Sequence, residues 1–292
     1  MSLHAPPMRL ALPKGRMQEG VHSLLGDAGI RLRAGSRGYR PSINLPNFEV
    51  KILKPQSIVE MLHLGSRDLG FAGADWVAEL GANLVELLDT GMDPVRVVAA
   101  APSAVARGLL GGDRPAKTLI VASEYERLTH AWIERRGLRA RFVRSYGATE
   151  VFPPEDADCI VDNTATGSTL TANGLDIIDE LMTSSTRLYG NPIMLEDPAR
   201  RAIAEDFVLV VRSVIEARQR VMLEVNVAPE NLEAVIAVLP CMREPTVSPL
   251  HGNRGYAVKA AVPRELLPRL IPDIKAHGGT DVVVTTLAQI VP

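Results

Sequence analysis

The stretch Asp158-Cys-Ile-Val-Asp162-Asn-Thr-Ala-Thr166-Gly-Ser-Thr-Leu170 decides the fold, because it passes from an apolar run into small and hydroxyl-bearing residues. The run at residues 159–161 predicts a buried strand that ends at Asp162. A strand, a short loop and a helix form the repeating unit of an α/β fold, and ligands bind such folds at the carboxyl ends of the strands. We therefore expect Asp162 at the ligand-binding edge of a sheet.

The residues after Asp162 are suited to hold a phosphate group. Backbone N–H groups at the start of a helix bind anions, helped by the positive end of the helix dipole. Gly167 lets the backbone approach closely, and hydroxyls add donors. The residues expected around the phosphate are Thr164, Ala165, Thr166, Gly167, Ser168, Thr169 and Leu170. Asp162 is expected to accept hydrogen bonds from sugar hydroxyls; the alternative for the segment is that Ser and Thr only cap a helix.

Short apolar runs and helical segments alternate through the first part of the chain. Strands are expected at residues 8–12, 48–53, 69–72, 95–101, 119–122, 141–144 and 159–161. Leu170 and Leu175 fit the apolar face of a short helix that follows the phosphate loop. This order predicts an α/β layer with a mainly parallel sheet, and two similar lobes in succession predict a ligand cleft between them.

Local signals place the ends of several helices. Glycines are expected to end three of them, at Gly29, Gly65 and Gly137. Ser57 with Glu60 and Ser123 with Glu126 have the spacing of capping boxes, which predicts helix starts there. Residues 102–117, which contain several Gly and Pro residues, are expected to form a loop.

From Asp197 onward the pattern changes. Asp197 is expected to cap a long helix in which Pro198 holds the first position. Strands are then expected at residues 221–227, 246–250, 256–262 and 281–285, with helices opened by Pro229 and Pro263. The order βαββαβ is that of a ferredoxin-like domain. Such domains commonly sense small ligands or pair with copies of themselves, although fold alone does not establish either role.

Composition argues against several classes of protein. The net charge of −2 gives no overall attraction to nucleic acid or to an anionic membrane, so neither partner is expected. Cys159 and Cys241 have no CxxC partner and are expected to be small buried hydrophobes. The 6 histidines lack zinc-type spacing, so no structural metal site is expected. The sequence has neither an apolar leader nor a run as long as a membrane span, so a cytoplasmic location is expected.

Five motifs follow one another along nearly the whole chain. They are Leu12-Pro-Lys14-Gly-Arg16, Asp68-Leu-Gly-Phe-Ala-Gly73-Ala-Asp75-Trp76, Gly147-Ala-Thr-Glu150, the phosphate loop with Asn173-Gly174-Leu175, and Leu239-Pro240 with Pro245-Thr246-Val247-Ser248-Pro249-Leu250. In content and order they resemble the long form of the ATP phosphoribosyltransferase family, in which the loop binds phosphoribosyl pyrophosphate (PRPP).

The resemblance implies a reaction, a fold and a mode of regulation. N1 of ATP would displace pyrophosphate from PRPP, with Mg²⁺ held mainly through substrate phosphates, in the first step of histidine biosynthesis. Residues 1–102 with 187–216, and residues 103–186, would form two lobes shaped like a periplasmic binding protein, the chain returning at residues 187–192. Residues 217–292 would form the ferredoxin-like domain that binds L-histidine as an inhibitor, usually within a homo-hexamer.

Basic and aromatic residues near the strand ends are candidates for the ATP side. Lys14 and Arg16 are expected to neutralise phosphates of ATP or of departing pyrophosphate, because cations at a helix start otherwise oppose the dipole. Lys54 is a candidate of the same kind or an ordinary surface lysine. Asp75 and Trp76 follow a glycine-rich turn, and Trp76 either packs near the adenine or belongs to the core.

The remaining candidates lie near the loop and in the C-terminal domain. Glu150 is expected to hold a ribose hydroxyl, the alternative being a surface glutamate. Thr246, Ser248 and Asn226 are expected to contact histidine, the alternative being ordinary strand residues. The resemblance implies an acidic residue near the Asn226 position in some relatives, so a charge partner for the inhibitor is missing here. The reaction needs no covalent nucleophile, and neither a nucleophile nor a general base is assigned.

Three other functions fit parts of the sequence. A binding protein without chemistry shares the two lobes and the cleft, but it leaves the phosphate loop unexplained. A regulatory protein with a decayed loop conflicts with the Asp, Gly and hydroxyl residues that the loop retains. A phosphoribosyltransferase acting on another base shares the loop, and only the N-terminal and C-terminal motifs favour ATP.

Overall fold

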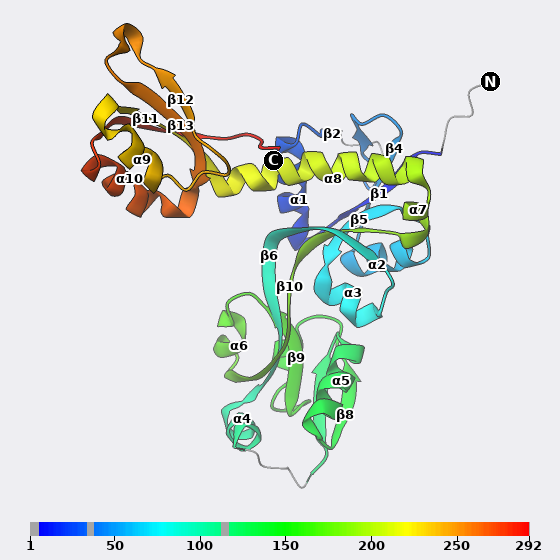
Figure 1. Cartoon of the computed structure of the whole chain (residues 1–292). Coiled ribbons are helices and arrows are strands. Elements are labelled where there is room, and N and C mark those ends of the chain that lie inside the picture. Colours follow the sequence, from blue (N-terminus) through cyan, green and yellow to red (C-terminus); the bar gives the residue numbers. More distant parts are fainter. Residues whose placement is uncertain (1–5, 34–37, 112–116, 292) are drawn as a thin grey trace, which may run out of the picture. The chain divides into compact units, whose positions relative to one another are not determined.

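The computed structural model describes residues 6–33, 38–111 and 117–291 (Figure 1). The chain forms two compact units, Met1–Ser23 with Ile30–Ala204, and Leu24–Gly29 with Glu205–Pro292. Within the described residues, every helix is too short or too polar to cross a membrane. The further division of the first unit into two lobes stays a prediction.

The first unit is built on an eight-stranded mixed sheet. Its strands are β1 (Met8–Pro13), β4 (Phe48–Leu53), β5 (Leu69–Gly73), β6 (Val85–Pro102), β7 (Leu119–Ser123), β8 (Ala140–Arg144), β9 (Cys159–Thr164) and β10 (Leu175–Gly190). The order across the sheet is β4-β1-β5-β10-β6-β9-β7-β8. Pairs at both ends are parallel, but β10 pairs antiparallel with β5 and β6, and β6 with β9. The expected mainly parallel sheet is therefore wrong for the centre, where β6 and β10 run in opposite directions.

The length of β6 and β10 is the main departure from the expected strands. Leu175 does not continue the short helix after the phosphate loop but opens β10, which has 16 residues. The chain return expected at residues 187–192 is therefore the last part of a much longer strand. Figure 1 shows β6 and β10 side by side along most of their length. A second, two-stranded sheet pairs β2 (Leu32–Arg33) with β3 (Ser42–Ile43).

Helices follow most strands of the first unit. They are α1 (Arg16–Asp27), α2 (Pro55–His63), α3 (Ala74–Leu80), α4 (Ser103–Leu110), α5 (Glu126–Arg136), α6 (Ser168–Ala172) and α7 (Pro192–Glu196), with a 3-10 turn η1 (Thr149–Val151). The loop expected at residues 102–117 is wrong for its first half, since α4 buries Ala106 and Leu109 there. Its residues 112–116 lie outside the described part of the chain.

Both expected capping boxes are wrong. Helix α2 begins at Pro55, before Ser57, because the fixed φ of proline suits the first helical position. Helix α5 begins at Glu126, and its first N–H groups are capped not by Ser123 but by the carboxylate of Glu79, which accepts from Arg127 at 3.1 Å and Leu128 at 3.0 Å. The Ser123 hydroxyl instead donates to the Val161 carbonyl at 2.5 Å and accepts from the Tyr125 N–H at 2.8 Å, so it ties β7 to β9. Gly137 ends α5 in the left-handed conformation, as expected.

The long helix α8 (Pro198–Gln219) begins as predicted. The Asp197 carboxylate accepts from the N–H groups of Ala199 at 2.9 Å and Arg200 at 3.3 Å. The second unit continues with β11 (Arg220–Val227), η2 (Pro229–Asn231), α9 (Leu232–Val238), β12 (Thr246–Pro249), η3 (His251–Asn253), β13 (Tyr256–Pro263), η4 (Arg264–Leu266), α10 (Leu267–Ala276) and β14 (Gly279–Thr286). Its sheet has the order β12-β13-β11-β14 with antiparallel pairs, which confirms the ferredoxin-like βαββαβ expectation.

The alternation along β11 separates the two faces of this small sheet. Val221, Leu223, Val225 and Val227 are buried in the core with residues of α9 and α10. The side chains between them lie on the opposite face of the sheet. Cys159 is buried and Cys241 is half-buried, and both are free thiols.

Candidate functional site

Two adjoining cavities lie in the first unit. The first, which we call the basic cavity, has a volume of about 550 Å³; the second, the loop cavity, about 500 Å³. The basic cavity is lined by Lys14, Gly15, Arg16, Met17, Lys54, Pro55, Gln56, Gly73, Asp75, Trp76, Asp93, Val95, Glu124, Asn163, Ser184, Ser185 and Thr186. The loop cavity is lined by Arg16, Glu124, Gly147, Ala148, Thr149, Glu150, Asp162, Asn163, Thr164, Ala165, Thr166, Ser168, Thr169 and Leu170. Arg16, Glu124 and Asn163 line both, so the cavities share a boundary.

The structure separates the predicted residues into the two groups that the sequence suggested. Lys14, Arg16, Lys54, Asp75 and Trp76 all line the basic cavity. Glu150, Asp162 and the phosphate segment line the loop cavity, with Gly167 buried just behind it. The grouping arises because the carboxyl ends of the parallel strands β1, β4 and β5 and that of β9, which runs in the opposite direction, meet beside the middle of the long strands β6 and β10.

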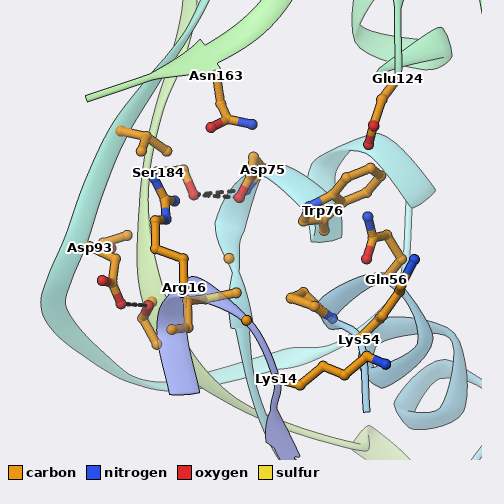
Figure 2. Close-up of a pocket in the computed structure, with 17 residues that line it drawn as sticks. Lys14, Arg16, Lys54, Gln56, Asp75, Trp76, Asp93, Glu124, Asn163 and Ser184 are labelled. Atoms are coloured by element: carbon orange, nitrogen blue, oxygen red, sulfur yellow. Dashed lines mark hydrogen bonds between the residues drawn. The ribbon is translucent and has the colours of Figure 1, made fainter. Parts of the chain in front are cut away.

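The basic cavity is lined by three cations, Lys14, Arg16 and Lys54, and also by the carboxylates of Asp75, Asp93 and Glu124. Lys14, Arg16 and Lys54 form no ion pair with any residue that the structure describes. The Lys14 ammonium lies 5.4 Å from the centroid of the Tyr39 ring, a cation–π distance. Figure 2 shows Lys14 and Lys54 on the side of the cavity away from Asn163 and Glu124, and Arg16 extending from α1 toward Ser184. Unpaired cations around a cavity of this size suit a polyanionic ligand.

The phosphate segment forms a tight turn ahead of α6. Gly167 adopts φ 84°, a left-handed conformation that glycine tolerates, and its N–H donates to the Thr164 hydroxyl at 2.9 Å. The hydroxyls of Thr166 and Ser168 are 2.9 Å apart, and the Ser168 N–H donates to Thr166 Oγ1 at 3.3 Å. The N–H groups of Gly167 and Ser168 thus hold the turn together, and it gathers the hydroxyls of Thr164, Thr166, Ser168 and Thr169 at the cavity, which suits an anion with several oxygens.

Acidic side chains form the other side of the loop cavity. Burial, together with the nearby charges of Glu150 and Glu124, raises the pKa of Asp162 to about 6, against a lowering by the N–H of Asn163. That N–H donates to Asp162 Oδ1 at 2.7 Å. The carboxylates are suited to accept hydrogen bonds from hydroxyl groups, and a bound cation would relieve their mutual repulsion.

A buried hydrogen-bonded network forms the floor of the basic cavity. The Asp75 carboxylate accepts from the Ser184 hydroxyl at 2.7 Å and from the Tyr125 hydroxyl at 2.6 Å. The Asn163 amide donates to the Tyr125 oxygen at 2.9 Å. The rings of Trp76 and Tyr125 are stacked with centroids 4.8 Å apart. Trp76 thus belongs partly to the core and partly to the cavity wall, and its packing near an adenine stays a prediction.

Several residues of the cavities and of the hydrogen-bonded network beside them were not predicted from the sequence. They are Gln56, Asp93, Glu124, Tyr125, Asn163, Ser184, Ser185 and Thr186. A local signal existed for Asn163 and Glu124, which directly follow Asp162 and the strand at residues 119–123. Asp93 comes from β6, and Ser184, Ser185 and Thr186 come from β10; the lengths of both strands were underestimated, so nothing local marked these residues. Gln56 lies in α2, and Tyr125 precedes α5 and reaches the site through its hydrogen bond to Asp75.

No group of three or more His, Cys, Asp or Glu side chains is placed to hold a metal ion within residues 6–33, 38–111 and 117–291. The carboxylates of Asp162, Glu150 and Glu124 nevertheless line one cavity, and the pKa of Asp162 is raised chiefly by burial and also by the charges of the two glutamates. This donor set fits a hard cation that takes one or two protein oxygens and completes its coordination with ligand phosphates and water.

The three residues predicted for inhibitor binding share one face of the small sheet in the second unit. Ser248 and Asn226 are both register partners of Ala257, so they lie in one row across β12, β13 and β11. Thr246 lies in the next row and lines a separate cavity of about 350 Å³. Asn226 donates to Asp281 Oδ2 at 3.1 Å, which brings an acidic side chain beside it.

Comparison with known proteins gives matches over almost the whole chain. A family profile described as ATP phosphoribosyltransferase matches residues 54–212, and one described as HisG, C-terminal domain, matches residues 217–289. The ATP phosphoribosyltransferase of Pelotomaculum thermopropionicum is 35% identical over 293 residues, covering 98% of this chain and 99% of that protein. The ATP phosphoribosyltransferase of Chlorobium phaeovibrioides is 36% identical over 282 residues, covering 93% of each.

A solved structure is also similar. It is described as the ATP phosphoribosyl transferase (HisG:HisZ) complex from Thermotoga maritima, with a TM-score of 0.63 and 27% sequence identity. The match covers 72% of this chain and 98% of that one.

Proposed function

This chain belongs to the ATP phosphoribosyltransferase family, and on that premise we propose that the loop cavity binds PRPP and the basic cavity binds ATP. The family's activity transfers the phosphoribosyl group of PRPP to N1 of ATP and releases pyrophosphate, the first step of histidine biosynthesis. The matching C-terminal domain brings feedback regulation by histidine. The observation that carries the assignment is the shared boundary of one cavity rich in hydroxyls and carboxylates and one lined by unpaired cations.

In the loop cavity, we place the 5-phosphate of PRPP on the segment from Thr164 to Thr169. The hydroxyls that this turn gathers at the cavity support this placement, because a phosphate accepts several hydrogen bonds at once. Asp162 and Glu150 then face the ribose, where ionised carboxylates accept from the 2- and 3-hydroxyls. This orientation directs C1 of the ribose toward the boundary that Asn163 and Arg16 share with the basic cavity.

In the basic cavity, Lys14, Arg16 and Lys54 neutralise polyphosphate. Their lack of acidic partners supports the role, since a cation already paired has less to offer a ligand. Trp76 lies at the cavity wall and offers a face for the adenine.

The chemistry needs positioning and electrostatics rather than a nucleophilic side chain. The N1 lone pair forms a bond to C1 as the bond from C1 to the pyrophosphate oxygen breaks, so positive charge builds on the ribose and the adenine while negative charge leaves with pyrophosphate. Asp162 lies on the ribose side and Asp75 on the adenine side, where carboxylates stabilise that positive charge. Arg16, which lines both cavities, stabilises the leaving group.

Mg²⁺ fits the same arrangement. Glu124, which lines both cavities, and Glu150 are the side chains that would hold it, with the remaining ligands supplied by phosphates and water. When bound, Mg²⁺ neutralises charge on the departing pyrophosphate. Removal of the ion with a chelator should abolish turnover, and activity that persists at full rate in excess chelator would contradict this assignment.

We extend the proposal to domains, inhibitor and assembly. Residues 1–102 with 187–216 and residues 103–186 act as two lobes of the catalytic part, and residues 217–292 as the regulatory domain. Histidine binds the open face of the small sheet at Asn226, Thr246 and Ser248, which share that face. The working form is a homo-hexamer in the cytoplasm, and the subunit number is measurable by light scattering coupled to gel filtration.

Substrate binding tests the assignment of the cavities directly. PRPP and ATP are titrated separately, by calorimetry in the presence of Mg²⁺, into wild-type protein, Asp162→Asn and Lys54→Met. We expect Asp162→Asn to weaken PRPP and Lys54→Met to weaken ATP, each leaving the other ligand unchanged. The reverse pattern would show that the cavities are exchanged. Pyrophosphate release from ATP and PRPP, with and without histidine, checks the activity and its inhibition in the same samples.

A further inference from the structure

Asn163 occupies the boundary between the two cavities. It lines both of them, and it directly follows Asp162 near the end of β9. Figure 2 shows its carboxamide extending from the strand toward Asp75 and into the basic cavity. Given the substrate assignment above, this is the point where the ribose carbon and the attacking nitrogen must meet.

The network beneath Asn163 fixes which end of its carboxamide faces the cavity. A tyrosine hydroxyl has one proton, and Tyr125 gives that proton to the Asp75 carboxylate at 2.6 Å, since an ionised carboxylate only accepts. The Tyr125 oxygen must then accept from Asn163, so the amide nitrogen is the atom at 2.9 Å. Burial, with the charge of Asp75, raises the pKa of Tyr125 far above its ordinary value, so the hydroxyl keeps its proton.

The opposite end of the carboxamide is therefore the oxygen, Oδ1. Among the described residues no group donates to this oxygen, whereas the amide nitrogen is held by Tyr125. Ser184, which donates to the other oxygen of Asp75 at 2.7 Å, holds that carboxylate in place. The boundary of the two cavities thus presents a neutral acceptor in a fixed orientation.

Adenine has a donor beside its reactive nitrogen. The 6-amino group is attached to the carbon next to N1, so it must lie close to the ribose C1 whenever N1 attacks that carbon. Resting on the proposed function, we propose that Asn163 Oδ1 accepts a hydrogen bond from this amino group. Asn163 is thereby a specificity-determining residue that selects a 6-amino purine and opposes a 6-oxo purine, whose oxygen would face another acceptor.

The same hydrogen bond favours the reaction itself. As the N1 lone pair bonds to C1, positive charge spreads over the ring to the 6-amino group and makes it a stronger donor. An acceptor already oriented there stabilises the transition state more than the bound substrate. Tyr125 acts as a positioning residue, because without its hydroxyl the carboxamide is free to turn its nitrogen toward the ligand.

The test compares ATP with purine riboside triphosphate, which keeps N1 but lacks the 6-amino group. The measured quantity is the ratio of kcat/KM for ATP to that for the analogue, so intrinsic differences in N1 reactivity cancel between proteins. Asn163→Leu, of similar volume, should lower this ratio by about ten-fold or more, chiefly through ATP, while KM for PRPP stays within about two-fold. Tyr125→Phe should lower the ratio by about three-fold.

Asn83→Leu is the matched control, an exposed asparagine whose change should leave the ratio at the wild-type value. If Asn163→Leu fails to fold by circular dichroism, Asn163→Ala carries the same comparison. Equal losses on ATP and on the analogue would overturn the proposal and leave Asn163 a structural residue. A wild-type protein that folds but turns over neither nucleotide would instead contradict the proposed function.

Discussion

The loop cavity and the basic cavity differ in how they offer positive potential to a phosphate. In the loop cavity the donors are N–H groups and hydroxyls of one short segment, residues 164–169, set among carboxylates. In the basic cavity they are the charges of Lys14, Arg16 and Lys54, carried by the ends of different strands. Directional donors orient a sugar phosphate, whereas mobile cations tolerate a flexible polyphosphate and a leaving group. Two adjacent sites for similar anions can therefore bind them with different groups: fixed hydroxyl and N–H donors in one, and mobile charged side chains in the other.

The largest effect should follow from removing the charge of the sugar carboxylate. Asp162→Asn keeps the shape of the side chain but weakens two charge-assisted hydrogen bonds, so kcat/KM for PRPP should fall by about 100-fold. Initial rates of pyrophosphate release at varied PRPP give the value. Asp156→Asn, at an exposed site near the same strand, is the control and should behave as wild type. A loss expressed in KM for ATP alone would mean that the two cavities do not divide the substrates.

Removing one cation of the basic cavity should have a smaller, graded effect. Lys54→Met should raise KM for ATP by about ten-fold with KM for PRPP unchanged, because the remaining cations keep part of the potential. The dependence of KM on salt should also become shallower, since screening has fewer charges to act upon. Lys275→Met, an exposed lysine of α10, is the control. Equal changes in KM for ATP and for PRPP would show that the two cavities do not bind different substrates.

The pH dependence of substrate binding should also differ between the two cavities. With a pKa of about 6, Asp162 is ionised above that pH and protonated below it. PRPP binding by calorimetry should therefore weaken several-fold from pH 7.5 to pH 5.5, and Asp162→Asn should lack this dependence. ATP binding to the cations should change less. A PRPP affinity that is flat in wild-type protein across this range would contradict the assigned role.

The same pKa predicts a stability effect of opposite sign. The folded-state pKa lies above the ordinary value of 3.8, so the ionised form costs stability, in full above about pH 6, and the cost is lost as pH falls toward 4. Asp162→Asn should therefore be the more stable protein at pH 8, and the difference should shrink toward pH 4. Denaturant unfolding at both pH values, without substrate, measures it. A stability difference that grows toward pH 4 would show that Asp162 is stabilised as a carboxylate.

The smallest expected effect lies outside both cavities. Ser248→Ala removes one hydroxyl from the open face of the small sheet and should raise the histidine concentration for half inhibition by about three-fold. Rates without histidine should match wild type, because the change touches neither substrate. Thr286→Ala, at an exposed position of β14, is the control. An altered KM for PRPP or ATP in Ser248→Ala would place this serine in the catalytic part instead.

The parts that could be predicted from sequence are those in which neighbours along the chain act together. The phosphate segment, the Asp197 cap and the βαββαβ order of the second unit each depend on residues a few positions apart. The grouping of the basic-cavity residues also followed, because the carboxyl ends of the parallel strands β1, β4 and β5 share one edge. The approach of β9 from the opposite direction did not follow from the sequence. The ligand roles of those residues stay predictions.

What escaped prediction depends on contacts between distant segments. The Asp75–Ser184 hydrogen bond joins positions 109 residues apart, and no local pattern marks Ser184 as a cavity residue. At the ends of β6 and β10, apolar and polar residues alternate only weakly, because pairing with the neighbouring strand, rather than a local residue pattern, keeps these segments in the sheet. The capping boxes failed for a related reason: the Ser123 hydroxyl bonds across to β9 instead of closing a helix.

The paired strands β6 and β10 have an irregular point beside the basic cavity. Their register shifts between Thr186 and Arg187, whose partners are Met92 and Asp89, so Thr90 and Gly91 form an insertion in β6. Gly91 has φ 65°, and its N–H donates to the Asp89 carboxylate at 2.8 Å rather than to the opposite strand. The rate of amide hydrogen exchange at Gly91 should therefore report whether the basic cavity is occupied. We expect the rate to fall when ATP binds and to stay unchanged when PRPP alone fills the loop cavity.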